Sequence, residues 1–304
     1  MTNQVLMFSQ PRTACHVLER MLSKQSNTAY FGHAFNESIP IAAGWESKKS
    51  CVDGMPESEK AQFEAAVGRE CNRWKQELEA AEKDGQKFFL HTHPYFLQSR
   101  ERALEYVKAP IKDHATATKH ALVPDELLLR PGTKPFFVIR HPYLWIPSAV
   151  RATAANLKFG GFGDGGKGIY YMVGSLTWSR ELFDWYQTKG ITPVVTDAED
   201  FLSGEAYVRH LCKNVGLNPD EALLSWDKGA DTFDEEMPEL LRNVQDNLLQ
   251  SSGAKAGRKA KDIDLEAEPV KWDAEFGENS KMVRELVDLA MPHYEHLWRQ
   301  RLTM

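Results

Sequence analysis

Residues 4–22, QVLMFSQPRTACHVLERML, contain the pattern that decides the fold: an apolar run, a polar turn and apolar residues at helical spacing. The run Gln4–Phe8 is short and favours β structure, as is typical of a central strand in a parallel sheet. Leu18, Met21 and Leu22 then recur on one helix face. A strand, a turn and a helix in succession are the basic unit of an α/β fold.

The same succession recurs along the chain. Residues 28–56 look irregular, and their aromatic residues indicate either a loop that lines a pocket or a surface loop anchored by aromatic side chains: Tyr30, Phe31, His33, Phe35 and Trp45. The glycine-rich stretch 158–168 is expected to be a mobile loop. The pattern predicts an α/β three-layer sandwich whose central parallel sheet of about four to five strands is flanked by helices, with ligands at the carboxyl ends of the strands. Further strands are expected at 87–91, 135–139 and 191–195. A helix should follow the strand at 135–139 and run to about residue 157, and further helices are expected at 57–83, 96–107, 169–187, 205–215, 219–226, 237–249 and 280–302.

The composition excludes several classes of function. A net charge of −6 argues against non-specific binding of nucleic acid. The four cysteines form no Cys-x-x-Cys pair, which favours reduced thiols in an intracellular protein. No apolar stretch approaches the length of a membrane span. We therefore expect a cytoplasmic protein, a monomer or homodimer, with no nucleic-acid or membrane partner.

The turn Pro11–His16 has the features of an anion site. Backbone N–H groups at a helix start, and the helix dipole, attract negative charge. Arg12 adds a fork of donors that suits phosphate oxygens, and Thr13 and Cys15 can also donate. No Walker sequence is present, which disfavours magnesium-dependent hydrolysis of a nucleoside triphosphate. The alternative interpretation is an ordinary helix start with a solvated arginine.

A second anion site is indicated where the strand at 135–139 ends. Arg140 leaves that strand, and Ser148 follows eight residues later on the next helix, so both can reach one phosphate group. An arginine at a sheet edge followed by an ordinary helical serine is the alternative. Taken with the first turn, the pair indicates a ligand that has two separate phosphate-type groups.

Two histidines follow the strand at 87–91. His91 and His93 are two residues apart, so on an extended chain they point to the same side. His93 is a candidate general base, because an imidazole can accept a hydroxyl proton near neutral pH. No third ligand with suitable spacing is visible, so no metal is predicted. Each histidine can also be read as a buried, hydrogen-bonded residue.

Together, these three segments resemble the sulfotransferase family, whose members transfer a sulfuryl group from PAPS (3′-phosphoadenosine 5′-phosphosulfate) and release PAP. Pro11–His16 matches the loop that binds the 5′-phosphosulfate, and Arg140-His141-Pro142 with Ser148 matches the pair that binds the 3′-phosphate. His91-Thr92-His93 resembles the Lys-Thr-His segment that carries the base. The resemblance implies one domain over 1–304, a P-loop-like fold and closest similarity to fungal members.

The resemblance also implies roles for individual residues. The implied catalytic residues are His93, as general base, with Arg12 and His91. Residues 194–200 resemble the family's strand ending in Glu-Asp-Leu, and the polar break at 251–262 falls where the family carries a late basic loop. The residues implied in binding PAPS are Arg12, Thr13, Ala14, Cys15, His16, Arg140, Ser148, Arg258 and Lys259.

The sequence departs from the family pattern at the sulfuryl end. Ala14 replaces a glycine and is expected to fit only with a negative φ. His16 replaces a small hydroxyl residue, His91 replaces a lysine, and Val17 stands where some members carry a tryptophan that stacks on adenine. Two other functions therefore stay open: a non-sulfating lyase or cyclase of small-molecule biosynthesis that uses His91 and His93, and a non-catalytic nucleotide-binding protein.

The acceptor implied by the family is a small hydroxylated molecule. Aromatic residues close to the marked segments favour an apolar or aromatic acceptor, although aromatic residues line most ligand pockets. These residues are Phe31, Phe35, Tyr95, Phe96 and Trp145.

Overall fold

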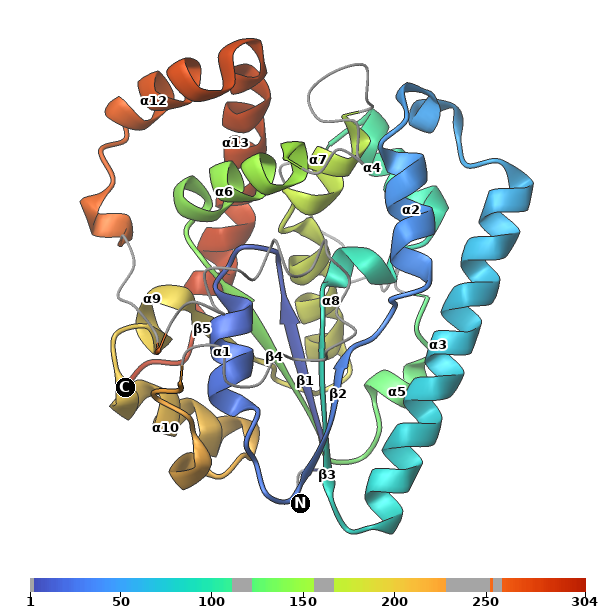
Figure 1. The fold of residues 1–304 in the computed structure, drawn as a ribbon, viewed down its shortest axis with the longest axis vertical. Helices are drawn as coiled ribbons and strands as arrows, with labels where there is room; N and C mark the ends of the chain where they lie inside the picture. Colours follow the sequence, from blue (N-terminus) through green and yellow to red (C-terminus); the bar gives the residue numbers. More distant parts are fainter. Residues whose placement is uncertain (1–2, 111–121, 156–166, 228–251, 254–258) are drawn as a thin grey trace.

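A five-stranded sheet forms the centre of the computed structural model, which describes residues 3–110, 122–155, 167–227, 252–253 and 259–304 (Figure 1). All strand pairings in it are parallel, in the order β2-β3-β1-β4-β5. The predicted α/β sandwich with a parallel sheet of four to five strands is confirmed. The strands are β1 (Gln4–Ser9), β2 (Thr28–His33), β3 (Lys87–Thr92), β4 (Thr133–Ile139) and β5 (Val194–Asp197).

β1 is the central strand, and all six of its residues are buried. It pairs with β3 on one side and β4 on the other, with Phe8 opposite Thr92 and Ser9 opposite Val138. The carboxyl ends of these three strands therefore meet at one edge of the sheet. The polar segments singled out in the sequence lie at or just beyond that edge.

Helices cover both faces of the sheet. Alternate β1 side chains point to opposite faces, so that Val5 and Met7 pack in a core with α1 and α10, and Leu6 and Phe8 pack in a core with α3, α6, α8 and α13. Figure 1 shows α3 along one flank and α1 with α10 along the other. The α-helices are α1 (Cys15–Leu22), α2 (Ser38–Glu46), α3 (Glu57–Lys83), α4 (Arg100–Lys108), α5 (Asp125–Leu128), α6 (Pro142–Ala154), α7 (Gly168–Val173), α8 (Thr177–Thr188), α9 (Ala198–Phe201), α10 (Glu205–Val215), α12 (Ala267–Phe276) and α13 (Ser280–Trp298).

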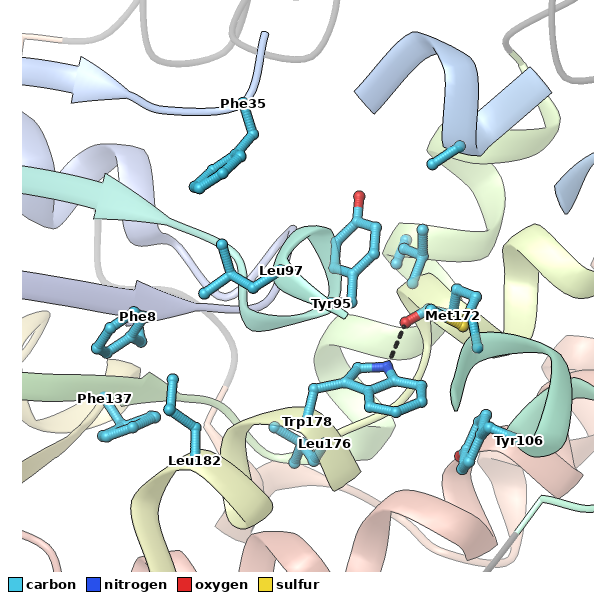
Figure 2. Close-up of a cluster of buried hydrophobic side chains, with 14 of the residues drawn as sticks. Phe8, Phe35, Tyr95, Leu97, Tyr106, Phe137, Met172, Leu176, Trp178 and Leu182 are labelled. Carbon is cyan, nitrogen blue, oxygen red and sulfur yellow. Dashed lines mark hydrogen bonds between the residues drawn. The ribbon is translucent and has the colours of Figure 1, made fainter. Parts of the chain in front are cut away.

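Aromatic side chains dominate the larger core (Figure 2). The rings of Phe8 and Phe137, on neighbouring strands, have centroids 5.1 Å apart. Farther from the sheet, Tyr106 meets Trp178 edge to face at 4.8 Å. The Trp178 indole Nε1–H donates to the carbonyl of Met172 at 3.2 Å, so the buried indole nitrogen is satisfied.

The region 28–56, expected to be irregular, was predicted wrongly. It contains the edge strand β2 and helix α2. All six β2 residues are only partly buried, and the pairing register shifts between Tyr30 and Gly32. An edge strand of this kind lacks the continuous apolar run that identifies buried strands.

Several helices outside residues 28–56 also differ from the prediction. The stretch 219–226 forms only the short 3₁₀ turn η4 (Pro219–Glu221), because the Asn218 side chain accepts from the Asp220 N–H and fixes a turn. The stretch 169–187 divides into α7 and α8 near Gly174. Helix α12 was not predicted at all. The predicted helix 237–249 and most of the glycine-rich stretch, 158–166, lie outside the described residues.

Among the helices that the structure describes, none is both long enough and apolar enough to cross a membrane.

Candidate functional site

The loop between β1 and α1 has an unusual backbone. Arg12 has φ 68° and Ala14 has φ 61°, two of the three positive values found among the described non-glycine residues. The expectation that Ala14 keeps a negative φ is therefore wrong. Left-handed backbone costs an L-residue about 1–2 kcal/mol, and such strain is concentrated at functional sites in folded proteins.

Local contacts hold the loop in this shape. Thr13 is fully buried, and both its hydroxyl and its backbone N–H donate to the Gln10 carbonyl, at 2.6 and 3.4 Å. The Ala14 carbonyl accepts from the N–H groups of Val17 and Leu18, which starts α1. Thr13 therefore shapes the turn. Left-handed residues such as Arg12 and Ala14 direct nearby N–H groups out of a turn, a feature of anion-binding nests.

The two predicted anion segments lie against each other. The Arg12 Nε–H donates to Ser148 Oγ at 3.1 Å, and an Arg140 Nη1–H donates to the Arg12 carbonyl at 3.3 Å. Arg140 lies just after β4, and Ser148 lies on α6. The three residues that the sequence assigned to two phosphate groups thus form one hydrogen-bonded set at the edge of the sheet.

This set concentrates positive charge in a partly buried place. Burial lowers the pKa of both guanidinium groups from 12.5. At Arg140, the negative charges of Asp197 and Glu199 oppose that effect, whereas the nearby charge of Arg12 adds to it. Among the described residues, Arg140 has no carboxylate within ion-pair distance. An anion bound here would therefore relieve repulsion between two desolvated cations.

The late basic segment is only partly described. Arg258 lies outside the described residues. Lys259 is half-buried, and the N–H of the next residue, Ala260, donates to Glu199 Oε1 at 2.5 Å. Because the charge of Glu199 also acts on Arg140, the segment that begins at Lys259 lies beside the same edge of the sheet.

The two strand-end histidines meet at Ser9, the last residue of β1. Ser9 Oγ lies 2.7 Å from His91 Nε2 and 3.0 Å from His93 Nδ1. His93 Nδ1 is also 2.9 Å from the Ser9 carbonyl oxygen, which can only accept. The proton of neutral His93 therefore belongs on Nδ1, and the lone pair on Nε2. Burial, together with the charges of His33 and His91, lowers the pKa of His93 well below 6.5, so the ring is neutral.

Three further buried or half-buried groups lie near these histidines: Glu19, which the sequence did not single out, and Tyr30 and His33 from the predicted aromatic loop. Glu19 Oε2 lies 2.9 Å from His16 Nδ1 and 3.1 Å from His91 Nδ1. The Tyr30 hydroxyl donates to the other carboxylate oxygen, Oε1. His33 ends β2, and its ring centroid is 4.2 Å from that of His91.

The cluster is strongly polarised. Burial works against charge on Cys15, but His16, His91 and Ser9 outweigh it and lower the pKa of the thiol to about 6. Burial likewise opposes a charge on His91, yet Glu19 and Cys15 raise the pKa of this imidazole to about 10. Cys15 is also the first residue of α1, where the helix N-terminus favours a thiolate. His91 thus carries positive charge at the position where the family has a lysine.

The aromatic residues expected near the acceptor fall into two groups. Tyr95 and Phe96 lie beside His93, with ring centroids 6.0 and 5.2 Å away. Trp145 is fully buried within the larger core and contributes to packing. Phe35 is also buried, with a left-handed backbone at φ 73°.

Two curated fungal proteins are similar to this chain in sequence. No family model matches the chain. The chain is 25% identical to "Sulfotransferase ppzF" of Metarhizium rileyi (strain RCEF 4871), over 97% of this chain and 95% of that protein. It is 26% identical to "Sulfotransferase ppzF" of Metarhizium majus (strain ARSEF 297), over 97% and 96%.

Two solved structures also align along most of the chain. The sulfotransferase domain from the Synechococcus PCC 7002 olefin synthase gives a TM-score of 0.45 at 16% identity, over 90% of this chain and 94% of that domain. The sulfotransferase from Alicyclobacillus acidocaldarius gives 0.39 at 12% identity, over 93% and 99%. The similarity to the two Metarhizium proteins extends over 97% of the chain, and it confirms the predicted resemblance to the sulfotransferase family and the prediction of a sulfotransferase enzyme.

Proposed function

We propose that this protein transfers a sulfuryl group from PAPS to a hydroxyl of a small apolar or aromatic acceptor. The observation that carries the proposal is the hydrogen-bonded set of Arg12, Arg140 and Ser148 beside a loop strained at Arg12 and Ala14. Two desolvated guanidinium groups and a concave row of N–H groups suit a ligand with several anionic groups.

The donors divide between the two ends of PAPS. The backbone of residues 12–16, with the Arg12 and His16 side chains, would hold the 5′-phosphosulfate, and Thr13 would keep the loop in shape. Arg140 and Ser148 would hold the 3′-phosphate, with Lys259 and Arg258 joining from the late basic segment. Arg12 contacts Ser148, so it would lie between the two anionic ends.

His93 is the proposed general base. Its Nδ1–H is directed at the Ser9 carbonyl, so Nε2 is the nitrogen that can accept a proton. The acceptor oxygen would attack sulfur, its proton would pass to Nε2, and the bond between sulfur and the 5′-phosphate oxygen would break. Little covalent help is needed in such a transfer, because positioning and charge stabilisation supply most of the rate. Arg12 and the loop N–H groups would stabilise the charge on the departing PAP.

The acceptor class follows from the surroundings of His93. The rings of Tyr95 and Phe96 lie next to the imidazole. An acceptor whose hydroxyl reaches Nε2 would therefore contact aromatic side chains, which favours an apolar or aromatic molecule.

Release of PAP from PAPS in the presence of a panel of phenols and aliphatic alcohols tests the proposal. We expect His93→Ala to lower kcat by about 10²–10⁴-fold and to leave PAP affinity within about threefold of wild type. His210→Gln, at a half-buried histidine on α10, is the matched control and should keep full activity. Normal turnover by His93→Ala would contradict the base assignment. Tight PAP binding without turnover on the panel would instead favour a non-catalytic nucleotide-binding protein.

Three further expectations stay predictions alongside this proposal. They are one domain over 1–304, a monomer or homodimer, and a cytoplasmic location.

A further inference from the structure

The cluster around His91 contains more titratable groups than a single general base requires. His16 and Glu19 are three residues apart on α1, and therefore share one helix face. His33 ends β2 and is paired in register with His91, the last residue but one of the neighbouring strand β3. Three imidazoles and one carboxylate thus converge from three separate elements.

The distances are those of ligands around one point. One ligand atom from each of the four residues can be chosen so that all four lie within 4.8 Å of one another. Zn²⁺ binds nitrogen and oxygen at about 2.0–2.2 Å, which puts tetrahedral ligand atoms about 3.4 Å apart. The two shortest pairs, from Glu19 Oε2 to His16 Nδ1 and His91 Nδ1, are already 2.9 and 3.1 Å. Modest side-chain rotations would close the remaining distances.

In His91 and Glu19, outer hydrogen bonds engage the side-chain atom that would face away from a bound ion. His91 Nδ1 is fully buried and makes no hydrogen bond of ordinary geometry with any described residue, even though Glu19 Oε2 is close. The opposite nitrogen, Nε2, is engaged by Ser9 Oγ, and the opposite oxygen of Glu19 is engaged by Tyr30. Ligands whose second atom is held by an outer hydrogen bond are the usual arrangement at protein metal sites.

We propose that His16, Glu19, His33 and His91 form a zinc site at the carboxyl edge of the sheet. Three imidazoles and a carboxylate suit Zn²⁺ better than Mg²⁺ or Ca²⁺, which prefer oxygen ligands. The His16 side chain is 19% exposed, which gives the ion a route from solvent. The ion would replace the proton that the cluster otherwise shares between Glu19 and the imidazoles.

The role of the ion, unlike its binding, rests on the proposed function. His16 belongs to the loop that would hold the 5′-phosphosulfate, and His91 stands at the position of the family's lysine. A divalent cation between them would supply positive charge at the end of the site where the sequence departs from the family.

The test is zinc binding by untagged protein, stripped of metal with a chelator and then dialysed. Calorimetric titration should give one Zn²⁺ per chain, and elemental analysis of protein purified without chelator should give the same ratio. Loss of a residue that only hydrogen-bonds a ligand typically weakens metal binding by about 10–100-fold. Removing a ligand itself, in His16→Gln or His33→Gln, should weaken zinc binding by more than that. Tyr30→Phe should weaken it within that range. His293→Gln, a buried histidine bonded to Thr177, is the control and should bind zinc normally.

Because His16 is at the rim of the cluster, His16→Gln should fold even if His33→Gln does not, and circular dichroism without metal checks this. Co²⁺ in place of Zn²⁺ should give the visible spectrum of a tetrahedral site without a thiolate charge-transfer band. A thiolate band would instead indicate Cys15, His91 and His93, a second group with suitable geometry, and would overturn the assignment. Absence of stoichiometric zinc, or unchanged affinity in folded His16→Gln, would also overturn it. PAP binding is measured separately on metal-free protein, so failure of the zinc site and of the proposed function are distinguishable.

Discussion

Replacing Ala14 by glycine should stabilise the protein, contrary to the usual effect of glycine. Ala14 has φ 61°, where the Cβ atom costs about 1–2 kcal/mol. Glycine removes that cost, but it gives the unfolded chain more freedom, which costs about 0.4–1 kcal/mol. The expected net gain in unfolding free energy is about 0.5–1 kcal/mol.

A second alanine separates strain from the loss of a methyl group. Ala222 is also half-buried and packs at the edge of the same core as Ala14, but its φ is −69°. Ala222→Gly should therefore destabilise by about 0.4–1 kcal/mol, because only the entropy of the unfolded chain changes. The difference between the two variants, about 1–2 kcal/mol, measures the strain at Ala14.

Urea unfolding of wild type and both variants at one pH gives the three free energies, provided that the slopes agree. PAP affinity of Ala14→Gly should stay near that of wild type, because glycine keeps the same backbone conformation. Equal destabilisation by the two substitutions would refute the reasoning, since it would mean that residue 14 carries no strain.

Three further predictions concern the cofactor site, the pH dependence and the core. Ser148→Ala removes the acceptor of the Arg12 Nε–H and a donor to the proposed 3′-phosphate. It should weaken PAP binding by about 10–100-fold in a calorimetric titration, and unchanged affinity would contradict the role of Ser148. Burial raises the pKa of Asp197 from 3.8 to about 6. The protonated carboxyl therefore contributes its whole share of the unfolding free energy below pH 3.8, and this share is lost as pH rises through 6. Asp197→Asn should therefore gain about 2–2.5 kcal/mol on wild type between pH 4 and pH 7, and parallel pH profiles in urea unfolding would count against it. Trp178→Phe leaves the buried Met172 carbonyl without its donor and should cost about 2–3 kcal/mol in unfolding free energy; a loss below about 0.5 kcal/mol would mean that the bond matters little.

The buried strands could be predicted because their environment imposes a simple pattern. β1, β3 and β4 are covered on both faces, so each reads as a continuous apolar run. β2 lies at the edge, half-exposed and irregular at Gly32, and carries no such run. Missing β2 also meant that His33 was predicted only as part of an aromatic loop, because only the pairing of β2 with β3 brings that residue beside His91.

The site was predictable as a set of segments, but not as a set of contacts. A parallel sheet must bring the ends of β1, β3 and β4 together, so the proximity of Arg12, His93 and Arg140 follows from the topology. Glu19 lies on a predicted helix, yet nothing local indicates that it faces His91, which is distant in sequence. The left-handed backbone at Ala14 was predicted wrongly: the family's glycine marks the position, but an alanine there favours a negative φ.

The central claim is that the donors at the ends of β1 and β4 form one site for PAPS. The most direct measurement is a calorimetric titration with PAP, with 5′-AMP and ATP as controls, on wild type and Arg140→Ala. We expect micromolar binding of PAP, at least tenfold weaker binding of both controls, and a loss of about 30-fold or more in Arg140→Ala, because a partly buried charge-assisted bond is removed. Equal binding of PAP and 5′-AMP, or no effect of Arg140→Ala, would contradict the account.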